Sequence, residues 1–196
     1  TFMQCPRAWH YIYRFGFKTK KSDSLFFGSA VHFGLEAYYR GEDAIKAFEN
    51  YLSSDRWERP KDFKSDGYSI IGKRLLDLYK TKSLYFEPEP GWIERKEVIN
   101  LANPVSGEII KVPFTFKIDL ITKDGYVVDH KTSKSASVKQ SESNRMQGIA
   151  YTMAYRTIFG KAPKGFIQNM LVVQKTNPRL IPSIFHYTID DEVEVF

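Results

Sequence analysis

Two aspartates and a lysine lie around one tight turn, where the aspartates could bind a divalent metal ion and the lysine could hold a water molecule beside it. Residues 114–121 alternate apolar and polar before the turn, and residues 126–128 are aromatic and β-branched after it. Both patterns are typical of strands. The residues between them, 123–125, end in Asp-Gly, which favours a hairpin because Gly125 can adopt φ > 0.

The length of this loop decides which side chains face each other. With the three-residue loop 123–125, Asp119 falls opposite Asp129, their Cβ atoms about 5 Å apart, and Lys131 shares that face. Facing carboxylates repel, and a Mg²⁺ or Mn²⁺ ion between them would remove the repulsion. Lys131 could then hold a water molecule and offset charge on a phosphate. With a two-residue loop the register shifts by one residue, and the aspartates fall on opposite faces.

An ordinary hairpin with solvated charges is the alternative, and it is the better account of any single charged residue here. With the three-residue loop, Asp119, Asp129 and Lys131 would all lie on one face of the hairpin, and this combination favours the metal site. From repulsion alone, Asp119→Ala is expected not to destabilise the metal-free protein.

Two expected helices could add side chains to this site. Gly28, His32 and Glu36 recur every four residues, so they share one helix face. A lone helical histidine is more often structural, but beside the hairpin the neutral imidazole of His32 could be a third metal ligand. Gln147 and Tyr151 lie one helical turn apart and could project toward the site, or could simply belong to the polar edge of their helix.

Other charged residues are open to two interpretations. Glu94 or Glu97 could reach the metal face, although an exposed strand carboxylate is the favoured account of each. Lys134 lies in a Ser- and Lys-rich loop that could touch a phosphate backbone or could be solvated. Arg7 belongs to a basic and aromatic segment that could grip phosphates, or could be core on one side and solvated on the other.

The composition is that of a folded domain with a basic surface. The 196 residues are 42% hydrophobic and 27% charged, which is enough for a buried core. The net charge of +6 suits a polyanionic partner. A single cysteine, Cys5, the lack of a long apolar run and the lack of a visible signal peptide predict a cytoplasmic protein. The start at Thr1 and the end at Phe196 suggest a piece of a slightly longer chain.

Periodic patterns predict the elements that position these residues. Helical spacing and end signals predict helices over 5–16, 25–40, 42–52, 69–79 and 143–159. Strands are predicted over 92–101, 109–121, 126–131, 165–174 and 183–189, with a chain break at 87–91.

This order predicts a single α/β domain over residues 1–196. Residues 1–85 would form its mainly helical part, and residues 92–196 its sheet core with one long helix. The sheet would be mixed, with a central meander, and flanked by helices.

Taken in order, the motifs resemble the PD-(D/E)XK nuclease superfamily, in its branch of RecB-like, phage-type and CRISPR-associated exonucleases. Each motif is weak by itself, but their joint order over nearly the whole chain is specific. The matching stretches are Cys5-Pro-Arg7, Gly28 to His32, Ile118-Asp119, Asp129-His130-Lys131 and Gln147 to Tyr151. The resemblance implies a restriction-endonuclease-like core.

The resemblance also implies residue roles. Asp119 and Asp129 would bind one or two Mg²⁺ or Mn²⁺ ions, and His32 and the main-chain carbonyl of His130 would complete the shell. Lys131 would position the attacking water. Two residues of the last motif, Gln147 and Tyr151, would orient the active site or touch DNA.

The implied reaction is hydrolysis of DNA phosphodiester bonds. An exonuclease is favoured over an endonuclease, acting on single-stranded DNA or on a free end, with a protein partner in phage DNA processing, recombination or repair. The alternative is a catalytically silent DNA-binding module or a subunit of a helicase–nuclease assembly. Ile118 stands where the family has a proline. Several RecB-like members hold an iron–sulfur cluster with four cysteines, but Cys5 is the single cysteine here. Either its partners would lie beyond Phe196 or this branch has no cluster, and no cluster is expected on this chain.

Overall fold

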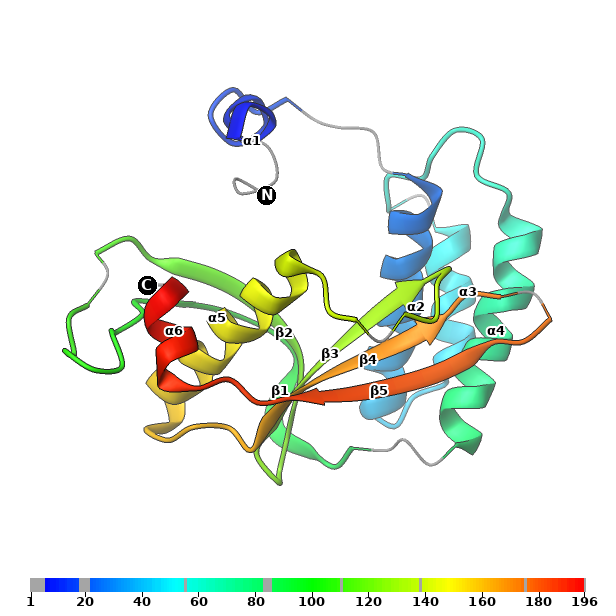
Figure 1. Ribbon diagram of the computed structural model, residues 1–196. Coiled ribbons are helices and arrows are strands. Elements are labelled where there is room, and N and C mark those ends of the chain that lie inside the picture. The colour runs from blue at the N-terminus through cyan, green and yellow to red at the C-terminus, as the bar shows by residue number, and fades with distance from the viewer. Residues whose placement is uncertain are drawn as a thin grey trace.

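The structure is a computed structural model that describes residues 6–17, 22–54, 56–82, 86–109, 111–137, 139–174 and 176–195 (Figure 1). Cys5, and with it the question of a cluster ligand, lies outside the described residues. The helices are α1 Pro6–Tyr13, α2 Asp23–Tyr39, α3 Ala44–Ser53, α4 Ser65–Thr81, α5 Glu142–Phe159 and α6 Ile189–Val195. The strands are β1 Pro88–Ile99, β2 Phe114–Thr122, β3 Tyr126–Ser133, β4 Gly165–Val172 and β5 Arg179–Phe185.

The five strands form one mixed sheet in the order β1-β2-β3-β4-β5. The first three form the predicted antiparallel meander, and β5 is antiparallel to β4. Only β3 and β4 are parallel, and α5 connects them. A parallel pair needs such a crossover, because the chain must return to the same end of the sheet.

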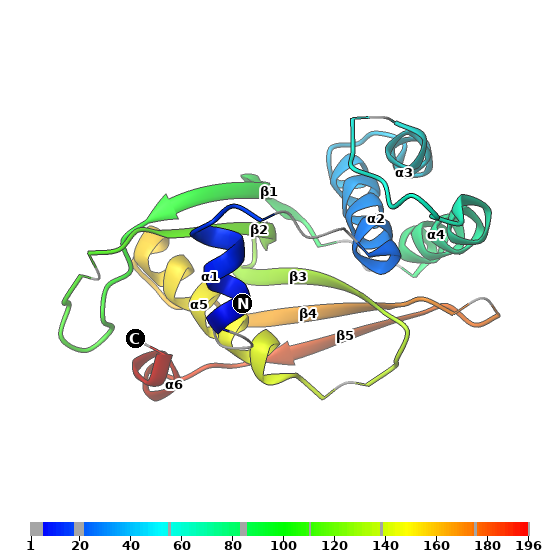
Figure 2. The same cartoon turned by 90° about the horizontal axis from the view of Figure 1, so that it is seen from above.

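Each face of the sheet is covered by its own helices (Figure 2). Helices α2, α3 and α4 cover one face, and α5 covers the other. Neighbouring residues of β3 show the division, since Val128 packs in the core beneath α2–α4 while Val127 packs in the core beneath α5. Within the described residues, no helix is both long and apolar enough to cross a membrane.

The register of the β2–β3 hairpin is the one predicted for a three-residue loop. Leu120 pairs with Val128 and Ile121 with Val127. Gly125 has φ +89°, and its amide donates to the Thr122 carbonyl at 2.8 Å. The glycine therefore supplies the left-handed conformation that closes the turn.

Several boundaries differ from the sequence prediction: α1 ends at Tyr13 rather than at residue 16, and β5 begins at Arg179 rather than at residue 183. β1 begins at Pro88, inside the predicted break, and its register shifts between Pro88 and Ile93. β2 begins at Phe114 rather than at residue 109, where Ile109 forms only an isolated bridge. α4 begins at Ser65, one turn before the predicted start.

The predicted strand 183–189 is wrong at its end, because the chain turns into α6 there. The Thr188 amide donates to Asp191 Oδ2 at 2.7 Å, and the Asp191 amide donates to Thr188 Oγ1 at 3.2 Å. This reciprocal pair is a helix-starting capping box. Glu192, fully buried, then accepts hydrogen bonds from Arg156 of α5, so α6 is tied to α5.

Packing between α3 and α4 leaves no room for a side chain at Gly72. A Cβ atom there would lie 2.1 Å from Phe48 Cζ, and Phe48 is fully buried. We expect Gly72→Ala to lower the free energy of unfolding by about 1–3 kcal/mol, since overpacking outweighs the helix propensity of alanine. Urea denaturation measures the change.

Gly67→Ala in the same helix is the matched control, because no atom lies within 4 Å of its Cβ position. It should leave stability unchanged or raise it by up to about 1 kcal/mol. A stabilising Gly72→Ala would contradict this account of the packing.

Candidate metal and active site

The candidate site lies where β2 and β3 stop pairing and separate. Their ladder reaches Leu120 and Val128, and Asp119 and Asp129 follow immediately on either side of the fork. The main-chain amide of His130 points toward β2 and donates to Asp119 Oδ2 at 2.7 Å. The Asp119 carboxylate thus accepts a hydrogen bond that a main-chain carbonyl of β2 would accept in a regular ladder. This bond holds the carboxylate at the point where the two strands separate.

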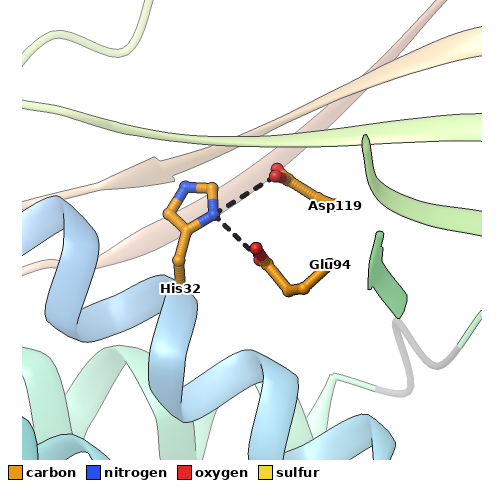
Figure 3. A group of neighbouring side chains, drawn as sticks. All are labelled: His32, Glu94 and Asp119. Atoms are coloured by element: carbon orange, nitrogen blue, oxygen red, sulfur yellow. Dashed lines mark hydrogen bonds and ion pairs between the residues drawn. The ribbon is translucent and has the colours of Figure 1, made fainter. Parts of the chain in front are cut away.

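Three side chains from three elements meet at this fork (Figure 3). His32 comes from α2, Glu94 from β1 and Asp119 from β2. The Nδ1 atom of His32 lies 3.3 Å from Glu94 Oε1 and 3.4 Å from Asp119 Oδ1. One ligand atom from each residue lies within 4.8 Å of the others, which is close enough for all three to bind the same ion.

Glu94 is the residue that the sequence analysis undervalued, because its carboxylate is not exposed. Its side chain is 5% exposed, and it also pairs with the Lys117 ammonium. Glu94 has φ +50°, which is uncommon for a residue other than glycine and is often found at functional sites. Its neighbours in β1 pair with Leu120 and Ile118, so Glu94 stands across from Asp119.

A second set of hydrogen bonds runs from Asp129 into α5. Lys131 Nζ donates to Asp129 Oδ1 and to Gln147 Oε1, both at 2.9 Å. Gln147 Nε2 donates to the Tyr151 hydroxyl at 2.9 Å, and this hydroxyl donates to the Lys117 carbonyl at 2.7 Å. Gln147 and Tyr151 therefore project to the site as one of the sequence interpretations expected, where they hold the Lys131 ammonium beside Asp129.

The two aspartates have opposite electrostatic environments. Burial tends to raise the pKa of Asp119, but the charge and hydrogen bond of His32 outweigh it and hold this pKa well below its usual range. Burial and the charge of Asp119 raise the pKa of Asp129 to about 6, despite Lys131. Burial also lowers the pKa of His32, yet Asp119 and Glu94 raise it well above the ordinary value.

Because Asp119 has these partners, Asp119→Ala is expected to destabilise the metal-free protein, contrary to the expectation from repulsion alone. That substitution would leave the buried His130 amide without its acceptor and His32 without one of its two carboxylates. An unsatisfied buried donor destabilises a fold by about 1–3 kcal/mol, so stability should fall. The carboxylate that bears the uncompensated repulsion is Asp129.

The side chains of the other predicted residues do not join this group of three, although the His130 ring lies 6.2 Å from the His32 ring by centroids. The His130 side chain is buried on the opposite face of β3 from Asp129, with its Nδ1 3.2 Å from Asn169 Nδ2. Burial lowers the pKa of His130 to about 4. Lys134 is exposed at the bend after β3, and Arg7 is exposed on α1. The described contacts bring neither of these two to the cluster.

The donor set fits a hard divalent cation. Carboxylate oxygens and an imidazole nitrogen are ligands that Mg²⁺ or Mn²⁺ accepts. Asp129 is not in the group of three, but its Oδ2 atom is buried and has no hydrogen-bond partner. A buried carboxylate oxygen without a donor is unfavourable unless a cation satisfies it.

Comparisons with known proteins identify the family and the fold of this chain. The family model for the PD-(D/E)XK nuclease superfamily matches residues 1–192. A crystal structure of a candidate exonuclease from Eubacterium rectale has TM-score 0.55 and 19% identity, covering 93% of this chain and 65% of that one. A crystal structure of the protein SSO0001 has TM-score 0.38 and 14% identity, covering 93% of this chain and 77% of that one. No curated protein sequence matches. At 19% identity the Eubacterium rectale protein shows the fold alone, and this chain spans slightly under two thirds of its length.

The raised pKa of Asp129 predicts how metal-free stability depends on pH. The folded state binds a proton at Asp129 up to about pH 6, whereas the unfolded chain releases it near about pH 4. Stability should therefore fall as pH rises between these values. Asp129→Asn removes this loss, so it should be more stable than wild type at pH 7.5 by up to about 3 kcal/mol.

Urea denaturation in EDTA from pH 4 to 8 measures this difference. At about pH 4 the Asp129 side chain of wild type is neutral as well, so the free energies of unfolding of the two proteins should become similar. An Asp129→Asn protein that is less stable than wild type at pH 7.5 would rule out the uncompensated carboxylate.

The burial of Glu94 predicts that it binds metal. Glu94→Gln should weaken Mn²⁺ binding by at least about tenfold, the lower end of what losing even an outer partner of a metal ligand does. Isothermal titration calorimetry gives the affinity. Glu97→Gln on the same strand is the matched control, since Glu97 pairs with Arg95 outside the group of three. Equal affinities for Glu94→Gln and wild type would remove Glu94 from the metal site.

Proposed function

The chain belongs to the PD-(D/E)XK nuclease superfamily, and from that premise we propose that it is a Mg²⁺- or Mn²⁺-dependent deoxyribonuclease. The proposed reaction is hydrolysis of DNA phosphodiester bonds. We propose exonuclease action on single-stranded DNA or on a free DNA end, in phage DNA processing, recombination or repair.

One observation supports this proposal above the others. The carboxylates of Glu94 and Asp119 meet His32 where β2 and β3 separate, and the buried carboxylate of Asp129, beside the charge of Asp119, is paired with the Lys131 ammonium. The arrangement makes physical sense when a cation and a phosphate occupy it. A fold that only bound DNA would have no need for a partly desolvated acidic cluster inside a basic chain.

Each residue has a proposed role toward the ion. Asp119, Glu94 and His32 would hold it, together with Asp129 and the main-chain carbonyl of His130. When bound, the ion supplies charge neutralisation on the phosphate and a lowered pKa of coordinated water. The Asp119 carboxylate is fixed for this role by the His130 amide, at 2.7 Å.

Lys131 is the proposed catalytic cation. Its side chain is 31% exposed, and Asp129 and Gln147 fix the position of its ammonium. From there it would orient the attacking water and neutralise charge that develops on the phosphate oxygens. Gln147 and Tyr151 are positioning residues in this proposal, because they act through Lys131.

The net charge of +6 supports a polyanionic substrate. We propose that exposed Lys134 and Arg7 meet the DNA backbone, outside the cluster. A protein partner in recombination or repair, and a cytoplasmic location, remain proposals of the same kind.

Degradation of DNA labelled at one end tests the function. Wild type with Mg²⁺ or Mn²⁺ should shorten linear strands, and EDTA should stop the reaction. Lys131→Ala should lower the rate by at least about 100-fold, as expected for removal of a group that stabilises charge in the transition state. Lys96→Ala, an exposed lysine on β1, is the matched control and should keep its activity.

Two outcomes would contradict the proposal. Cleavage of circular single-stranded DNA at the same rate as linear DNA would exclude an enzyme that requires an end. Binding of DNA without cleavage under any metal condition would favour a catalytically silent nuclease-fold subunit.

A further inference from the structure

The groove that holds the acidic cluster has a second end of different chemistry. Its volume is about 890 Å³, within the range of about 300–1,000 Å³ that is typical of ligand clefts. His32, Glu94 and Asp119 line one part of it. Three aromatic residues, Phe33, Tyr51 and Trp57, line another part.

The aromatic residues form one cluster. The rings of Tyr51 and Trp57 are stacked, with centroids 4.7 Å apart and an interplanar angle of 14°. Phe33 lies 5.6 Å from Tyr51 and 6.2 Å from Trp57 by ring centroids. Tyr51 is 5% exposed, so it acts as the base of the cluster.

The two outer rings are partly exposed to solvent. Phe33 is 37% exposed and Trp57 is 38% exposed, although Tyr51 covers one face of the indole. Helix α2 links the two ends of the groove, because Phe33 is the residue next to His32. The open aromatic surface therefore has a fixed relation to the acidic cluster.

We propose that Phe33, Tyr51 and Trp57 form a stacking platform for an unpaired base of the DNA strand whose phosphate lies at the acidic cluster. This inference rests on the proposed nuclease function and makes its substrate more specific. Aromatic rings accept any base by stacking, so the platform would bind the strand without reading its sequence.

The platform also implies a single-stranded or unpaired end as substrate. A base within a duplex has both faces covered by its neighbours, so it must leave the stack before a ring can contact it. The charged end of the groove would hold the backbone while the aromatic end holds the base. Division of labour between stacking and phosphate contacts is the usual way in which single strands are bound.

Binding measurements on two kinds of strand test the platform. The first is a single-stranded oligodeoxynucleotide, and the second is the same phosphate backbone with a tetrahydrofuran at every base position. Affinity is measured by fluorescence anisotropy with Ca²⁺ in place of Mg²⁺, at one salt concentration, with strand integrity checked on a gel. Wild type should bind the strand with bases more tightly.

Trp57→Ala should weaken binding of the strand with bases by about 5- to 150-fold, the range of stacking on one aromatic residue. Its affinity for the strand without bases should not change. Trp57→Phe should retain most of the preference, because it keeps a ring. Ile70→Ala, at an exposed apolar residue of α4 outside the groove, is the matched control and should behave as wild type.

The outcomes separate the platform from the nuclease function. Equal binding of both strands by wild type would overturn the platform, and this result needs no variant to fold. An equal loss for both strands in Trp57→Ala would also overturn it, since a general structural defect would have that effect. Binding requires no turnover, so a failure to cleave DNA would count against the proposed function and leave this comparison valid.

Discussion

The hydrogen bond from the His130 amide to Asp119 Oδ2 is the interaction on which the site depends. Antiparallel strands normally satisfy their amides with carbonyls across the ladder. Here a carboxylate does so, at the point where β2 and β3 separate. The same contact satisfies a main-chain donor, fixes the carboxylate and keeps the fork open. The backbone conformation at the fork and the position of the Asp119 carboxylate therefore depend on the same hydrogen bond.

The separation of β2 and β3 also explains why the pKa values of Asp119 and Asp129 are shifted in opposite directions. Asp119 has His32 and a main-chain amide as partners, so its charge is stabilised. Asp129 is buried beside the charge of Asp119, and the ion pair with Lys131 does not fully compensate. The metal-free protein thus holds one carboxylate in an unfavourable ionised state. Such a site gains from a cation, and marginal fold stability limits how much of this repulsion a chain can carry.

Residues from both faces of the sheet reach the cluster because the sheet is open there. α2 brings His32 from one face, while α5 brings Gln147 from the other to hold Lys131. The parallel β3–β4 pair requires the α5 crossover, and α5 is capped at both ends by Ser141 and Gly160. The helical layer of α2 and α3 supplies the aromatic end of the groove. The helices and the sheet therefore place the acidic cluster and the aromatic cluster in the same groove.

The sequence by itself determined the hairpin, the meander and the shared face of Asp129 and Lys131, because these follow from local spacing. It left the loop at two or three residues, and the structure settled the register. The sequence also placed His32, Gln147 and Tyr151 on the correct helices. Only the tertiary structure selected Glu94 over Glu97, since the long connection 100–113 leaves the β1–β2 register undetermined and the φ of +50° at Glu94 follows no local pattern. The unequal charge states of the aspartates likewise depend on burial and on partners from other elements. Local spacing specifies which face a side chain occupies, whereas contacts between distant segments decide what it meets there.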